Sequence, residues 1–210
     1  MLDDYHQNDN LSSVPRPSLE TVRREQILDA FAGCLAARGL EGTTLEAVAA
    51  EAGVQRSAIR HFVGNRNDLV AAAVEHLTEK YRACYAVALR DLPRGPRRGE
   101  RLLDFLFLGA FVSSLPLEGV AIDALRAAAS HDDQARSSLL GMYREFENHV
   151  FAELHKGHPR APVAAVRGAA HSIVCLAEES ASMQALGFPR SRARSARAAA
   201  AAIAAGLARR

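Results

Sequence analysis

The chain has 210 residues, of which 49% are hydrophobic and 24% charged, and its formal net charge at pH 7 is +2. This composition excludes a chain that is disordered throughout. The small net charge excludes an overall basic field that would by itself indicate nucleic-acid binding, so any such signal must come from a local cluster of charges.

Residues 1–17 are polar and end in Val-Pro-Arg-Pro, which cannot continue a helix, so we expect a disordered arm there. This start has no basic region followed by an apolar run, and no apolar stretch approaches the about 20 residues that span a bilayer. We therefore expect a cytoplasmic protein. The three cysteines are isolated and odd in number, and they predict neither a disulfide framework nor a metal site.

The first predicted helix begins at Ser18 or Thr21, and Gly39 is expected to close it as a left-handed cap. Thr43 and Thr44 then precede a second, short helix. Both threonines are candidate caps, and Thr43 is the candidate for a capping box.

A turn at Gly53-Val54 leads to a third helix, which is predicted from Gln55 or Arg56 to Val63. Its apolar residues are spaced at i, i+3 and i+4, so they form one buried stripe: Ile59, Phe62 and Val63. The opposite face therefore points outward and carries hydrogen-bond donors: Arg56, Ser57, Arg60 and His61. A short helix of this kind, braced by another helix and a turn, is typical of a helix-turn-helix that reads DNA.

Asn65 is the predicted cap of a long fourth helix, with Asp68 completing a capping box. A break rich in proline, glycine and arginine follows at 92–99. Further helices are predicted over 100–114, 117–130, 132 or 133–156, 163–186 and 191–208. No segment has the alternating pattern of a strand, so the chain is predicted to be all-α.

Residues 20–77 resemble the N-terminal domain of the TetR family of bacterial transcription regulators. The matching features are the pattern RREQILDAFAGCLAARGLEGTTLEAVAAEAGV, the turn after it, and NRNDL at the start of the fourth helix. The resemblance implies about nine helices in two parts. These are a three-helix DNA-binding domain at 18–65 and a larger helical domain for effector binding and dimerisation at 66–210. Two positions depart from the family: Arg60 replaces a common aromatic, and Gly64 stands where relatives often carry lysine.

Arg56 and Arg60 are one helical turn apart, and the forked guanidinium group suits bidentate contact with guanine or phosphate. Between Val54 and Asn67 there are three arginines and no acidic residue. We therefore predict a DNA-binding face made of Thr44, Gln55, Arg56, Ser57, Arg60, His61 and Arg66. The alternative for these residues is an ordinary solvated helix face.

The last two predicted helices, over about 163–208, are the candidate homodimer interface, because the final helix consists almost entirely of small residues. The preceding helix would contribute Val166, Ile173, Val174, Ala177 and Met183. The alternative is that both helices close the core of their own subunit.

Aromatic residues cluster between residues 105 and 151. The family resemblance implies a small apolar or amphipathic effector bound between the helices of the larger domain, oriented by polar groups among the aromatics. The candidate effector-binding residues are Phe107, Phe111, Tyr143, Phe146, His149 and His171. For each of them the alternative is ordinary core packing.

We therefore predict a DNA-binding transcription regulator, acting as a repressor that a small molecule releases from a palindromic operator. The alternatives are an all-α metal-dependent hydrolase or a metal-responsive regulator. The candidate ligands for these are the 131–133 segment (His-Asp-Asp) and a second set of His149, Glu153, His155 and His158. Asp132, however, is also an expected helix cap, and the second set does not share one helix face. The sequence has no GxSxG, HExxH or phosphate-binding glycine loop, so we expect no catalytic residue, metal or cofactor.

Overall fold

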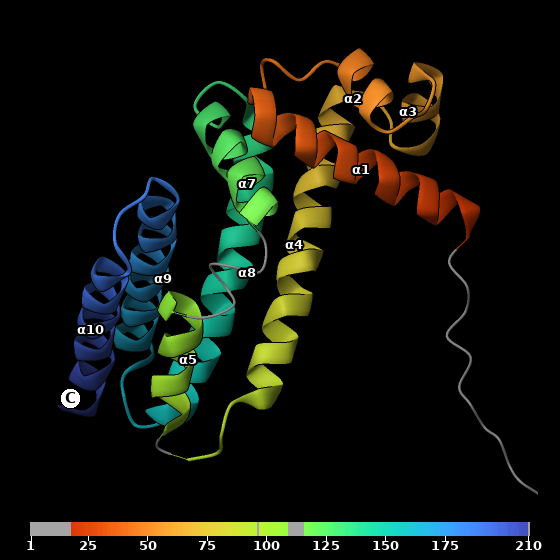
Figure 1. Cartoon of the computed structure of the whole chain (residues 1–210). Coiled ribbons are helices and arrows are strands. Elements are labelled where there is room, and N and C mark those ends of the chain that lie inside the picture. The colour runs from red at the N-terminus through yellow and green to blue at the C-terminus, as the bar shows by residue number, and fades with distance from the viewer. Residues whose placement is uncertain (1–17, 96, 109–115, 210) are drawn as a thin grey trace, which may run out of the picture.

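The computed structural model describes residues 18–95, 97–108 and 116–209; the predicted arm at 1–17 and Phe111 lie outside this range. Within it the fold is all-α, as predicted, with nine α-helices, a final 3-10 turn and no strand (Figure 1). The elements are α1 (Leu19–Arg38), α2 (Leu45–Glu51), α3 (Arg56–Phe62), α4 (Arg66–Asp91), α5 (Arg97–Leu108), α7 (Pro116–Ala128), α8 (Asp133–Gly157), α9 (Val163–Ala185), α10 (Arg190–Gly206) and η1 (Leu207–Arg209). None of these helices combines the length and the apolarity that crossing a membrane requires.

Side-chain caps fix where the first helices begin. Ser18 caps α1, because its Oγ accepts a 3.1 Å hydrogen bond from the Thr21 amide. Asn65 and Asp68 form the predicted capping box of α4: Asn65 Oδ1 accepts from the Asp68 amide, and the Asp68 carboxylate accepts from the Asn65 amide at 2.8 Å. The long fourth helix is thus defined locally, by residues at its own start.

The start of α2 corrects one prediction. Thr44 is its cap, with Oγ1 accepting a 3.1 Å bond from the Ala47 amide. Thr43 makes no capping box, because its side chain is buried and its hydroxyl donates a 2.7 Å bond to the Gly39 carbonyl. Gly39 has the expected positive φ of 69°, but its ψ of 177° lies outside the left-handed helical region.

Two hydrophobic cores lie along the molecule. The first joins α1, α2 and α3 to the N-terminal half of α4, to α7 and to the start of α8. The second joins α5, α9 and α10 to the end of α8 and to Tyr85 on α4. Figure 1 shows α4 and α8 running side by side from the α1–α3 end of the molecule toward α5. The division at 65/66 stays a prediction, and the core around α1–α3 continues into α7 and α8.

Polar bridges add to this first core. The Lys80 ammonium on α4 lies 2.8 Å from Asp29 on α1 and 3.0 Å from the buried Glu118 on α7. His76, one turn before Lys80, lies 2.8 Å from the same Asp29 carboxylate. Three helices therefore meet at one cluster of charged groups, which couples the position of α1 to that of α4 and α7.

Candidate DNA-binding face and candidate effector pocket

The outer face of α3 carries the predicted donors. Ile59 is fully buried, while Phe62 and Val63 are half-buried and pack against the first core, so the predicted stripe faces inward. The opposite side chains are all exposed: Arg56, Ser57, Arg60 and His61. Gln55 is also exposed at the cap position of α3, where its amide makes no capping bond. The face is therefore a connected set of exposed hydrogen-bonding groups.

Two side chains of α1 brace the helix-turn-helix from behind. Arg24 Nη1 donates a 2.8 Å bond to the Phe62 carbonyl at the end of α3. Gln26 Nε2 donates a 2.7 Å bond to the Ala52 carbonyl at the end of α2. Sequence reasoning missed both residues, because their partners lie far along the chain and no local pattern predicts them. They fix where the last turns of α2 and α3 stand relative to α1.

Two of the predicted DNA-binding arginines have carboxylate partners. Arg56 Nη1 lies 2.6 Å from Glu46 on α2, and Arg66 Nη1 lies 3.0 Å from Asp132, the cap of α8. Within the described ranges Arg60 has no carboxylate at ion-pair distance. Exposed pairs of this kind contribute at most about 1 kcal/mol and exchange readily for other anionic partners. Arg56 and Arg66 therefore stay available for contacts with DNA, while the carboxylate partner of each one orients its side chain.

The departure at Gly64 has a steric reason. Its φ is 122°, a conformation that side chains with a Cβ rarely adopt. A Cβ there would overlap the Asp68 carboxylate, which belongs to the capping box of α4. Glycine at 64 is therefore required by this turn, and lysine would not fit it.

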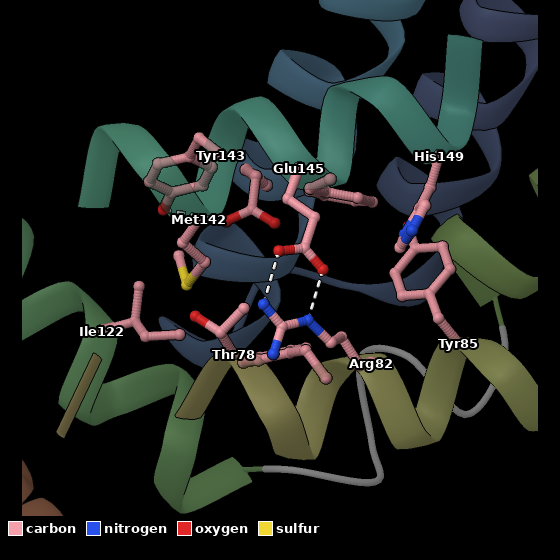
Figure 2. Close-up of a pocket in the computed structure, with 11 residues that line it drawn as sticks. Thr78, Arg82, Tyr85, Ile122, Met142, Tyr143, Glu145 and His149 are labelled. Carbon is pink, nitrogen blue, oxygen red and sulfur yellow. Dashed lines mark hydrogen bonds and ion pairs between the residues drawn. The ribbon is translucent and has the colours of Figure 1, made fainter. Parts of the chain in front are cut away.

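A pocket lies between α4, α7, α8 and α9, below the helix-turn-helix, with a cavity volume of about 40 Å³ (Figure 2). Three tyrosines and a phenylalanine give it aromatic walls. The full lining is Thr78, Tyr81, Arg82, Tyr85, Ile122, Met142, Tyr143, Glu145, Phe146, His149 and Glu178.

Arg82 on α4 and Glu145 on α8 meet across this pocket. The two bonds join Nε to Oε1 at 2.5 Å and Nη2 to Oε2 at 2.7 Å, as the dashed lines in Figure 2 mark. Arg82 Nη1 also donates to Glu75 and Glu79 on its own helix. The two bonds that Arg82 donates to Glu145 hold the pKa of Glu145 below its usual value of 4.5.

The pKa of Glu178 on α9 is shifted in the opposite direction to that of Glu145. Burial raises the pKa of this carboxyl above 4.5, against the opposing effects of the Arg126 charge and of a 3.3 Å hydrogen bond from the Tyr143 hydroxyl. Burial is also the main cause that raises the pKa of the Tyr81 and Tyr143 hydroxyls. The pocket therefore combines aromatic walls with one poorly solvated acid.

The structure brings together only part of the predicted effector set. Tyr143, Phe146 and His149 line the pocket. Phe107 is buried in the second core and does not line it. His171 is exposed on α9, away from the pocket, with Nδ1 3.2 Å from Glu147.

Sequence reasoning missed the pocket residues of α4, and on α9 it chose His171 where Glu178 lines the pocket. Tyr81 and Tyr85 lie one turn apart on α4, which was a usable signal. Glu178 follows four residues after the buried Val174, and an acid in that position of an apolar helix is also a signal.

Four of the five candidate dimer residues of α9 are corrected, while Met183 is half-buried and stays a candidate. Val166, Ile173, Val174 and Ala177 are buried in the second core, so they close their own subunit, the alternative considered for them. Other residues of the last two helices remain exposed. They are small residues of α9 and α10 (Ala164, Gly168, Cys175, Ala198, Ala199, Ala202 and Ala205), with Leu186 and Phe188 in the turn between them.

Three of the candidate metal ligands have other partners. Asp132 caps α8 with an Oδ1 that accepts from the Ala135 amide, and Glu153 is bonded to Arg98 and Lys156. The His155 ring stacks on Phe151. Across the described part of the chain, no group of three or more His, Cys, Asp or Glu residues is arranged to hold a metal ion.

Comparison with known proteins agrees with this geometry. Residues 27–73 match the sequence profile of bacterial regulatory proteins of the tetR family. The HTH-type transcriptional regulator BetI of Escherichia coli strain UMN026 is 25% identical over 149 residues, which cover 70% of this chain and 75% of that protein. These relatives give no support to a hydrolase or a metal-responsive regulator.

Solved structures share the fold over nearly the whole chain. A TetR-family regulator from Cytophaga hutchinsonii superposes with a TM-score of 0.75 at 17% identity, covering 91% of this chain and 98% of that one. The multidrug binding protein EbrR, complexed with imidazole, superposes with a TM-score of 0.63 at 20% identity, covering 90% and 96%. The likeness therefore extends beyond the helix-turn-helix to the helices around the pocket.

Proposed function

We propose that the chain is a member of the TetR family of bacterial transcription regulators, as the match of residues 27–73 supports, and that it acts as a cytoplasmic homodimeric repressor that a small effector releases from a palindromic operator. The observation that carries the proposal is the position of α4. This helix begins directly after the DNA-binding face of α3 and, three turns later, forms one wall of the pocket. One rigid element thus touches both sites.

Recognition of DNA would use the exposed face of α3. Gln55, Arg56, Ser57, Arg60 and His61 offer donors suited to base edges and phosphates. Thr44 and Arg66 flank this face at the starts of α2 and α4, where contacts with the phosphate backbone would fix the register.

Dimerisation would use the exposed small residues of α9 and α10, together with Leu186 and Phe188. These two large apolar side chains are 74% and 50% exposed in the single chain, which favours a covered position in the functional protein. A twofold dimer would place two α3 helices about 34–36 Å apart, one turn of DNA, and so favours a palindromic operator.

Effector binding would change the relation between α4 and α8. A cavity of about 40 Å³ holds about three waters, while pockets for drug-sized ligands measure about 300–1,000 Å³. A ligand therefore enters only if α4 moves away from α8, and that motion displaces α3. The ligand shifts the equilibrium because it binds the opened form more tightly. EbrR, with the same fold, is a multidrug binding protein complexed with imidazole.

Selection of binding sites from fragmented genomic DNA with the purified full-length protein tests the proposal. We expect an enriched palindrome whose half-sites are one helical turn apart. In a gel-shift titration, binding to that sequence should then weaken on Arg60→Ala and stay unchanged on Arg90→Ala, which replaces an exposed arginine at the far end of α4. Absence of any enriched palindrome would contradict the proposal.

A further inference from the structure

We infer that the pocket takes a compact organic cation, with the Glu178 carboxylate as its counter-ion and the surrounding aromatic rings as its walls. The inference rests on the proposed function in that it assigns a ligand class to the effector pocket. It depends on three features of the pocket: how its charges are paired, where Glu178 stands, and which rings line it.

The positive charges near the pocket are already matched. Arg82 is bonded twice to Glu145 and further to Glu75 and Glu79, so it is surrounded by more negative than positive charge. Arg126, which lies just outside the lining, is bonded to Asp123. An anionic ligand would have to displace one of these carboxylates from its arginine, and it would face the carboxylate so released.

Glu178 is the unmatched charge. Across the described residues the hydrogen bond from Tyr143, at 3.3 Å, is the one that its side chain accepts. Arg126 acts on it at longer range, but the charge of that arginine is shared with Asp123. With Arg82 neutralised by Glu145 and Arg126 by Asp123, ionisation of Glu178 gives the pocket one negative charge in excess, a form that burial disfavours while the carboxylate has no cationic partner of its own. A bound cation would supply the missing partner, and pairing would favour the ionised form of the acid.

The walls suit a cation that is weakly hydrated. Tyr81, Tyr85, Tyr143 and Phe146 line the pocket, and the ring centroids of Tyr85 and Phe146 are 5.1 Å apart. Figure 2 shows Tyr85 rising from α4 toward His149 on α8, while Tyr143 stands at the opposite end of the same stretch of α8. Aromatic rings attract cations through their negative faces, and such walls suit quaternary ammonium ions, because these ions are weakly hydrated and lose little on burial. The small volume of the closed pocket favours a compact ligand, because such a ligand needs the least separation of α4 from α8.

Three probes that share a compact methyl-rich body but differ in charge test the inference. They are tetramethylammonium, which is positive, tert-butanol, which is neutral, and trimethylacetate, which is negative. Binding to the full-length protein is measured by isothermal titration calorimetry and by the shift in thermal midpoint. We expect tetramethylammonium alone to bind and to raise the midpoint.

Glu178→Gln keeps the shape of the side chain and its hydrogen bond with Tyr143, and it should weaken tetramethylammonium binding about tenfold or more. Glu179→Gln is the matched control, because Glu179 is the next residue of α9, is exposed, and does not line the pocket. It should bind as the wild type does. Circular dichroism and the thermal midpoint without ligand confirm that both variants fold.

The inference is overturned if tert-butanol or trimethylacetate binds as well as tetramethylammonium, if none of the three binds, or if Glu178→Gln binds the cation like the wild type. Operator binding is measured on the same preparations. Its absence would contradict the proposed function, whereas intact operator binding with the wrong ligand preference contradicts the cation assignment alone.

Discussion

Arg82 and Glu145 join α4 to α8 through two hydrogen bonds, from Nε at 2.5 Å and from Nη2 at 2.7 Å. Since the proposed ligand must part these two helices, the pair should favour the closed, DNA-binding form. We expect Glu145→Gln to weaken operator binding about two- to fivefold, because the pair is partly exposed and its contribution is reduced by solvent.

The control for this prediction is Glu75→Gln. Glu75 bonds to the same guanidinium through Nη1, at 2.8 Å, but it lies on α4 and does not reach α8. A gel-shift titration compares the two variants. Equal loss of operator binding in both would mean that the charge of Arg82, and not the link between the helices, matters.

Arg60 should be the most sensitive single residue of the DNA-binding face, because it has no acidic partner in the described ranges and stands fully on the outer side of α3. Arg60→Ala should weaken specific binding by about 1–3 kcal/mol if the side chain reads a base. If it contacts phosphate, binding should fall on all sequences and the salt dependence should flatten. A titration at several salt concentrations separates the two, and no change in either would remove Arg60 from the site.

Gly64→Ala should destabilise the protein by about 1–3 kcal/mol, because it places a Cβ at a positive φ and against the Asp68 carboxylate. Urea unfolding followed by circular dichroism measures the change. The matched control is Gly141→Ala on α8, where a Cβ meets nothing within 4 Å. This substitution should raise the free energy of unfolding by about 0.5–1 kcal/mol, because alanine loses less conformational freedom than glycine in a helix. A neutral result at Gly64 would mean that this turn is not held in the conformation described.

Glu153 should make stability depend on pH. Burial alone would raise its pKa, but hydrogen bonds from Arg98 at 2.5 Å and Lys156 at 2.7 Å outweigh it and lower the pKa below 4.5. Because the pKa is lower in the folded state, the stabilisation is present above about pH 4.5 and is lost as the pH falls through the folded-state pKa. Glu153→Gln should therefore cost most at pH 7, and the difference from wild type in free energy of unfolding should shrink in acid. A constant difference between pH 7 and pH 3 would contradict this.

The sequence predicts features that depend on neighbours along the chain. The inward stripe of Ile59, the cap at Asn65 and the turn at Gly53 follow from spacing within a few residues, and all three are confirmed. It does not predict contacts that depend on how helices pack. Arg24 bonds to Phe62 and Arg56 pairs with Glu46 only because α1 and α2 stand where the first core holds them.

The pocket residues also divide into those that local spacing predicts and those that depend on how the helices pack. Tyr143, Phe146 and His149 were accessible to prediction because they share one face of a single helix, α8. Glu178 and Arg82 come from two other helices, and the shifts of their pKa values depend on burial for Glu178 and on carboxylate partners for Arg82. Neither property is encoded in local spacing, so the chemical character of the pocket becomes visible only in three dimensions.

The length of α4 has a mechanical consequence. At about 1.5 Å per residue, the stretch from Tyr85 back to Arg66 spans about 28 Å, and a tilt of about 5° around the pocket end would carry the far end about 2.5 Å sideways. In a twofold assembly both ends move, so the two displacements together reach about 5 Å, which exceeds the step of about 3.4 Å between neighbouring base pairs. In the proposed dimer, a ligand of only a few atoms would thus move the two α3 helices away from their half-sites. The reason is that α4 converts a small displacement at the pocket into a larger one at its N-terminal end.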